Sequence, residues 1–186
     1  MRTFTFRPTF TTAGRKKKGL RGLAGKPFHP PLTDIPVGAY VLAAGFDVVS
    51  LLTRGSLAHD LFRAATFAAI GGAIVSVFAA MTGIADWAGS TSVGTQARRT
   101  ANAHGITMIT VTLIVVVSIS LRLGTWQDDL KTPVIAAGLS VLVAVLTALG
   151  SAIGGTLVFN YGFNVETAGD SPVWHESEVD LLPGQK

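Results

Sequence analysis

Four long apolar stretches constrain this chain more than any other feature, because each is long enough to cross a lipid bilayer. They cover roughly residues 34–52, 64–85, 103–121 and 133–159. Crossing about 30 Å of hydrocarbon takes about 20 helical residues, and a helix satisfies its own backbone hydrogen bonds there. The alternating pattern of a barrel strand is absent. We therefore predict an all-α integral membrane protein.

Composition supports the same conclusion. Of 186 residues, 48% are hydrophobic and only 14% are charged, which is more apolar surface than one soluble domain of this size buries. The chain has no cysteine, and this excludes disulfides, iron–sulfur ligation and covalently attached haem. No nucleophile–base or phosphate-binding motif is present, so we expect a protein that is not an enzyme.

The breaks between the apolar stretches are short, at residues 54–63, 86–102 and 124–132. Short connections favour an up-down-up-down antiparallel four-helix bundle. We expect three parts: a basic, extended arm at 1–28, the membrane bundle at 29–160 and an acidic polar tail at 161–186. With an even number of spans, both termini lie at the same end of the bundle as the connection at 86–102. We call this end side A, and the opposite end side B.

Basic residues predict the orientation. Residues 1–33 hold eight Lys/Arg and no acid, and Arg98 and Arg99 belong to the same side. Side A is therefore expected to be cytoplasmic by the positive-inside rule. The arm includes a basic cluster for the membrane surface or an acidic partner, formed by Arg15, Lys16, Lys17 and Lys18. No nucleic-acid partner is expected.

Two ionisable residues lie near side B. Charged groups inside a span are costly and need a partner or a function. Asp47 belongs to the first span and Arg122 ends the third, so we predict that they form an intramembrane ion pair. The alternative is that Asp47 serves a proton or ion pathway.

A second polar group is predicted at side A, where the first span begins, the second ends and the third begins. Asp34 is expected to cap the first helix, because His29 precedes Pro30 and Pro31 and a residue before proline avoids the helical conformation. The predicted ligands for haem b or a divalent metal are His29, Asp34, Asp86 and His104. Residues expected to support them are Trp87, Arg98 and Arg99. The alternative is a capping and hydrogen-bonding cluster without a cofactor.

Five segments resemble one family of predicted membrane proteins, DUF2231. They are residues 29–38 (HPPLTDIPVG), Asp47, residues 82–87 (TGIADW), residues 97–99 with His104, and residues 154–162 (GGTLVFNYG). The likeness covers about residues 25–167 and implies a four-span bundle often found beside redox domains. Actinobacterial relatives carry a Rieske-type domain after the last span, and others accompany cytochrome c domains. In many relatives the position of Asp34 is His, which favours a ligand role over a cap.

The resemblance implies a bacterial inner-membrane protein associated with electron transfer. The tail from Trp174 looks like the lead-in to a Rieske-type domain but stops before any Cys-His ligand pair. Our leading expectation is a non-enzymatic membrane subunit or anchor that binds haem or a metal and works with redox subunits. The alternatives are an accessory subunit of a larger membrane complex without a cofactor, and a small transporter using Asp47.

Overall fold

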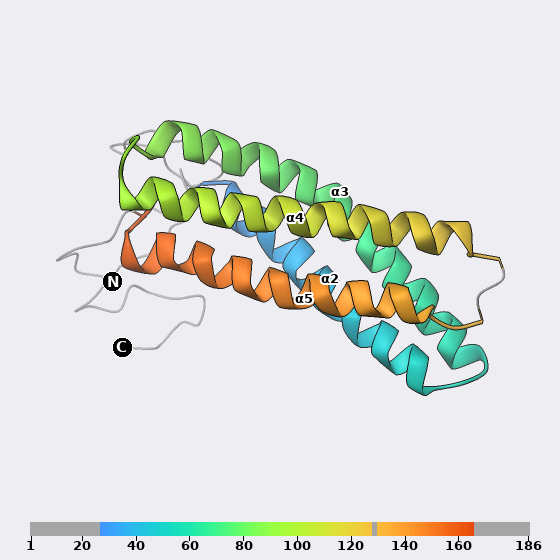
Figure 1. The fold of residues 1–186 in the computed structure, drawn as a ribbon. Helices are drawn as coiled ribbons and strands as arrows, with labels where there is room; N and C mark the ends of the chain where they lie inside the picture. The colour runs from blue at the N-terminus through green and yellow to red at the C-terminus, as the bar shows by residue number, and fades with distance from the viewer. Residues whose placement is uncertain (1–26, 128–129, 166–186) are drawn as a thin grey trace, which may run out of the picture.

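The computed structural model describes residues 27–127 and 130–165, which form four long helices (Figure 1). These are α2 (His29–Leu52), α3 (Ser56–Ser90), α4 (Gln96–Gly124) and α5 (Val134–Gly155). A π-helical turn, η2 (Thr156–Asn160), continues from α5. All four helices are long and apolar enough to cross a membrane. The expectation of an all-α membrane bundle is confirmed.

The helices form two antiparallel hairpins. α2 packs along α3 and α4 packs along α5, while α2 also contacts α5 and α3 contacts α4. The turn of each hairpin lies at the same end of the molecule, on the right in Figure 1. Consequently α2 and α4 run parallel and lie diagonally opposite each other. The starts of both helices face the same membrane surface, side A.

The interior of the bundle is lined largely with small residues and holds a central apolar cluster. Its members are Tyr40, Ala69, Val111, Val115 and Val143. The Tyr40 hydroxyl lies 2.8 Å from Ser76 Oγ, so its polar end is satisfied inside the bundle. Gly72 makes room for the ring, because a Cβ there would lie 2.6 Å from Tyr40 Cε1. Large apolar side chains such as Leu113 and Phe67 point outward, as a surface facing lipid requires.

The first helix begins earlier than the sequence suggested. α2 starts at His29, with Pro30 and Pro31 in its first turn, where the missing N–H groups would have had no helical acceptor. Its first hydrogen bond runs from Leu32 N–H to the Phe28 carbonyl, at 3.3 Å. Asp34 is exposed within the helix and caps nothing. The predicted cap at Asp34 is therefore wrong.

Helices α3 and α4 extend beyond the apolar stretches at both ends, so the connections are shorter than expected. The apolar stretches mark the part suited to lipid, whereas helical hydrogen bonding continues into polar residues. Thr95 caps α4 by accepting a hydrogen bond from the Arg98 N–H at 3.1 Å. Gly55 directly precedes α3, and Gly94 lies two residues before α4. Their φ angles are 68° and 83°, a conformation that favours glycine.

The described residues do not include most of the predicted arm and tail. The cluster of Arg15, Lys16, Lys17 and Lys18 lies outside them, as does the tail after Val165.

Candidate functional site

His29 is held at the start of α2 by the neighbouring helix α3. Its Nδ1 lies 2.9 Å from the carbonyl oxygen of Ala79, and 3.5 Å from Thr82 Oγ1. A carbonyl only accepts, so Nδ1 carries the proton and donates it to Ala79. That tautomer leaves a lone pair on Nε2.

His104 is held in the same manner by the other hairpin. Eight residues into α4, its Nδ1 donates to the Gly150 carbonyl oxygen of α5 at 2.8 Å. Again Nε2 keeps its lone pair. A backbone bond that fixes the tautomer and orientation of an imidazole is typical of histidines that bind metals through the other nitrogen.

Each ring lies against a glycine one turn beyond its hydrogen-bond acceptor. A Cβ at Gly83 would lie 2.8 Å from His29 Cε1, and a Cβ at Gly154 would lie 2.9 Å from His104 Cε1. Any larger residue would displace the ring. The two glycines therefore define the positions of the two imidazoles.

The rings meet between the hairpins. Their centroids are 6.1 Å apart and their planes are inclined by 84°. In sequence they are 75 residues apart, so only the bundle brings them together. Both are partly buried, and across the described segments neither Nε2 makes a hydrogen bond.

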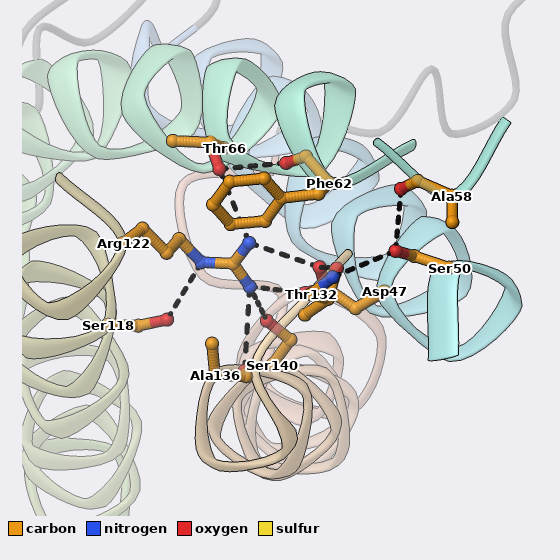
Figure 2. Close-up of polar contacts among 10 residues, drawn as sticks. All are labelled: Asp47, Ser50, Ala58, Phe62, Thr66, Ser118, Arg122, Thr132, Ala136 and Ser140. Atoms are coloured by element: carbon orange, nitrogen blue, oxygen red, sulfur yellow. Dashed lines mark hydrogen bonds and ion pairs between the residues drawn. The ribbon is translucent and has the colours of Figure 1, made fainter. Parts of the chain in front are cut away.

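At the side-B end, Asp47 and Arg122 form an ion pair that is completely buried (Figure 2). Arg122 Nη1 donates to Asp47 Oδ1 at 3.0 Å, and Nη2 donates to Asp47 Oδ2. The pair is bidentate, the geometry in which a guanidinium matches a carboxylate best. The structure thus joins the two charged residues that the sequence placed near this end.

Four side-chain hydroxyls form hydrogen bonds with the two charged groups, as Figure 2 shows. Arg122 also donates to Ser118 Oγ at 3.2 Å, Ser140 Oγ at 2.9 Å and Thr66 Oγ1 at 3.4 Å. Thr132 Oγ1 donates to Asp47 Oδ1 at 2.9 Å. The charges are therefore surrounded by partners on α2, α3, α4, α5 and the connection before α5.

The family model described as "Predicted membrane protein (DUF2231)" matches residues 25–167, which is most of the chain and contains both polar sites. The chain belongs to the DUF2231 family. No curated protein and no solved structure matches it.

In this DUF2231 chain, the four predicted ligands do not form one set. Asp34 is exposed, whereas Asp86 is buried in α3, three residues beyond Gly83. Within residues 27–127 and 130–165, no group of three or more His, Cys, Asp or Glu side chains is placed to hold a metal ion. The pair that the structure shows in contact is His29 and His104.

Of the three residues expected to support the histidines, Trp87 and Arg98 contact each other instead, and Arg99 contacts Gln96. The Arg98 guanidinium stacks on Trp87, 3.3 Å from the ring centroid, and donates to the Trp87 carbonyl at 3.0 Å. Trp87 Nε1 donates to Asn102 Oδ1 at 2.7 Å, and Arg99 pairs with Gln96. These contacts fix the connection between α3 and α4.

Gly83 and Gly154 lie in two of the segments that resemble the family, but the sequence did not relate either glycine to a histidine, and it did not single out the hydroxyls around Arg122. Glycine is common in membrane helices, so a glycine beside a histidine on another helix has no local signature. Ser118 had a signal, since it lies four residues before Arg122 on the same helical face. Thr66, Thr132 and Ser140 are brought in by the fold alone.

Proposed function

We propose that this DUF2231 protein is a non-enzymatic, integral membrane electron-transfer subunit that binds one haem b between His29 and His104. The observation that carries the proposal is the pair of imidazoles from diagonal helices, each with Nδ1 bound to a backbone carbonyl. Both leave Nε2 as a ligand, and their centroids are 6.1 Å apart.

The spacing of the rings fits one metal atom between them. Bonds from imidazole nitrogen to a transition metal are about 2.0–2.1 Å long, so two nitrogens on one metal are about 4 Å apart. Adding the distance from each nitrogen to the centroid of its own ring gives a centroid separation of about 6 Å. The centroid separation of 6.1 Å matches the value for two rings whose Nε2 atoms face each other across one metal.

The number of ligands favours haem over a free divalent ion. Structural and catalytic zinc sites take three or four protein ligands, whereas haem supplies four nitrogens itself and needs only axial ligands. His29 and His104 are the two histidines that meet, and within the described residues no group of three or more ligating side chains is placed to hold a metal ion. The close contact of each imidazole with Gly83 or Gly154 also suits rings that must keep a fixed orientation.

When bound, such a haem supplies a one-electron redox couple. The chain provides what tunes and protects it. The carbonyls of Ala79 and Gly150 hold both Nδ1 protons, which raises the basicity of Nε2. The surrounding apolar helices bury both rings in part.

The proposal places the protein in a bacterial inner membrane, with side A cytoplasmic and a redox subunit as partner. The positive charge of residues 1–33 and of Arg98 and Arg99 supports that orientation. Transport through Asp47 is not favoured, because the carboxylate is engaged by Arg122 and Thr132 and has no exposed surface.

The test is an absorption spectrum of protein purified in detergent after expression with haem supply. We expect a Soret band and, after reduction, sharp α and β bands of a six-coordinate haem. His29→Ala and His104→Ala should each remove the six-coordinate spectrum, while His59→Ala, on the α3 segment near side B, should not. A colourless wild type that also takes up no added haem contradicts the proposal.

A further inference from the structure

The two hairpins have equivalent positions along their lengths. A separation of 75 residues relates His29 to His104 and also Asp47 to Arg122. The same shift relates further buried positions of α2 to buried positions of α4, namely Pro36 to Val111, Tyr40 to Val115 and Ala43 to Ser118. Four of the six buried positions of α2 thus fall on buried positions of α4; the exceptions are Ala44, whose equivalent Ile119 is half-buried, and Ser50, whose equivalent Thr125 follows α4.

The second helices match with a shift of 71 residues. Every buried position of α5 and η2 then falls on a buried position of α3. Examples are Ser76 with Thr147, Ala79 with Gly150 and Asp86 with Leu157. The shift is four residues smaller than in the first helices, about one helical turn.

Helical periodicity alone aligns the buried faces of many helix pairs, but it does not explain the polar contacts. His29 donates to the carbonyl of residue 79 and lies on Gly83; His104 donates to the equivalent residue, 150, and lies on the equivalent Gly154. A histidine, its acceptor and its glycine thus recur as one unit in both hairpins.

The hairpins are also arranged as a pseudo-two-fold pair. α2 and α4 both start at side A and are diagonal, and each contacts the second helix of the other hairpin. The related axis runs along the bundle, as in membrane proteins built from parallel repeats. Residues that meet on such an axis are equivalent, and His29 meets His104 just as Asp47 meets Arg122.

We infer that the chain is a tandem duplication of one helical hairpin, and that Asp47 and Arg122 are the equivalent residues that make the two unlike hairpins pair. If both positions held the same charge, like charges would meet in the bundle interior and repel. Pairing α2–α3 with the α2–α3 hairpin of a second copy would bring two Asp47 side chains together. The opposite charges therefore select the arrangement in which His29 faces His104.

The surroundings of the pair differ between the hairpins as this inference requires. Arg122 donates to Ser118 and Ser140. The equivalent positions in the first hairpin are Ala43 and Ala69, which are buried and apolar. The two serine hydroxyls thus belong to the hairpin that holds the guanidinium. The hairpin that holds the carboxylate has alanines at the equivalent positions.

The test moves the guanidinium to the equivalent position. Asp47→Arg and Arg122→Asp should each lower the Tm of detergent-purified protein by about 10 °C, since a like-charged pair is buried. The combined Asp47→Arg and Arg122→Asp variant should recover about half of that loss. A combined variant no more stable than the less stable single variant, or one that does not fold, overturns the inference.

The hydroxyl groups provide a control that only the duplication predicts. Ala43→Ser, Ala69→Ser, Ser118→Ala and Ser140→Ala together move both hydroxyls to the first hairpin. They should lower the Tm with the native pair and raise it with the exchanged pair. A lowered Tm in both backgrounds overturns the inference. The Tm values are measured on haem-free protein, so that the outcome does not depend on haem binding.

Discussion

Gly83 and Gly154 are the residues on which the positions of the histidines most directly depend. An added Cβ would come within 2.8 Å of His29 Cε1 or 2.9 Å of His104 Cε1, so Gly83→Ala and Gly154→Ala must displace a ring. We expect haem affinity to fall about 10–100-fold, as for other changes that disturb the support of a ligand. Haem titration of the purified variants, followed at the Soret band, measures this loss.

Gly71 and Gly138 are matched controls on the same two helices. Nothing lies within 4 Å of a Cβ at either position. Alanine there should leave haem affinity unchanged and stabilise the helix by up to about 1 kcal/mol. Equal losses in all four variants would show that the two glycines have no particular relation to the histidines.

The buried charges of Asp47 and Arg122 make a second prediction at the scale of residues. Asp47→Leu or Arg122→Met alone leaves one charge unpaired in the bundle and should cost about 3–5 kcal/mol. The double change removes both charges and should cost less than either single change. Unfolding curves in detergent give the stability of the wild type, the two single variants and the double variant. If the loss in the double variant equals the sum of the two single losses, the two charges do not stabilise each other.

At the scale of helices, the sequence predicted the four spans well because lipid imposes a long apolar stretch on each of them. It predicted their ends poorly. The first turn of α2 holds Pro30 and Pro31 without loss of hydrogen bonds, and Asp34 therefore lies inside the helix instead of capping it. The polar ends of α3 and α4 remain helical although they leave the apolar region, so hydropathy does not mark their limits.

The candidate site was predicted in part for the same reason. Alternating spans bring the starts of α2 and α4 to one end, which was enough to associate His29 with His104. Which way a side chain points depends on helix rotation, and this separates His104, which faces the interior, from the exposed Asp34. The carbonyls of Ala79 and Gly150 act as partners only after the helices pack.

The arrangement of the helices predicts which connections share a membrane face. Val93 lies between α3 and α4 and is 90% exposed; Leu130 lies between α4 and α5 and is 80% exposed. Since the chain has no cysteine, Val93→Cys and Leu130→Cys each supply a single reactive thiol. An impermeant maleimide added to intact spheroplasts should label Cys at 130, and label Cys at 93 only after lysis. Labelling of both in intact cells contradicts the topology, and the reverse pattern contradicts the orientation.

At the scale of the whole molecule, the proposed haem and the ion pair occupy opposite ends of one bundle. Asp47 lies 18 residues beyond His29 along α2, which corresponds to about 27 Å at 1.5 Å per residue. The axis at side B is filled by the buried ion pair of Asp47 and Arg122, and the proposed redox site lies at side A. Electrons should therefore enter and leave the protein at side A only. In oriented membrane vesicles, ferricyanide, which does not cross the bilayer, should oxidise the reduced haem rapidly when side A faces outward and slowly when it faces the lumen. Equal rates in both orientations would place the haem too near the centre of the bilayer for the His29–His104 site.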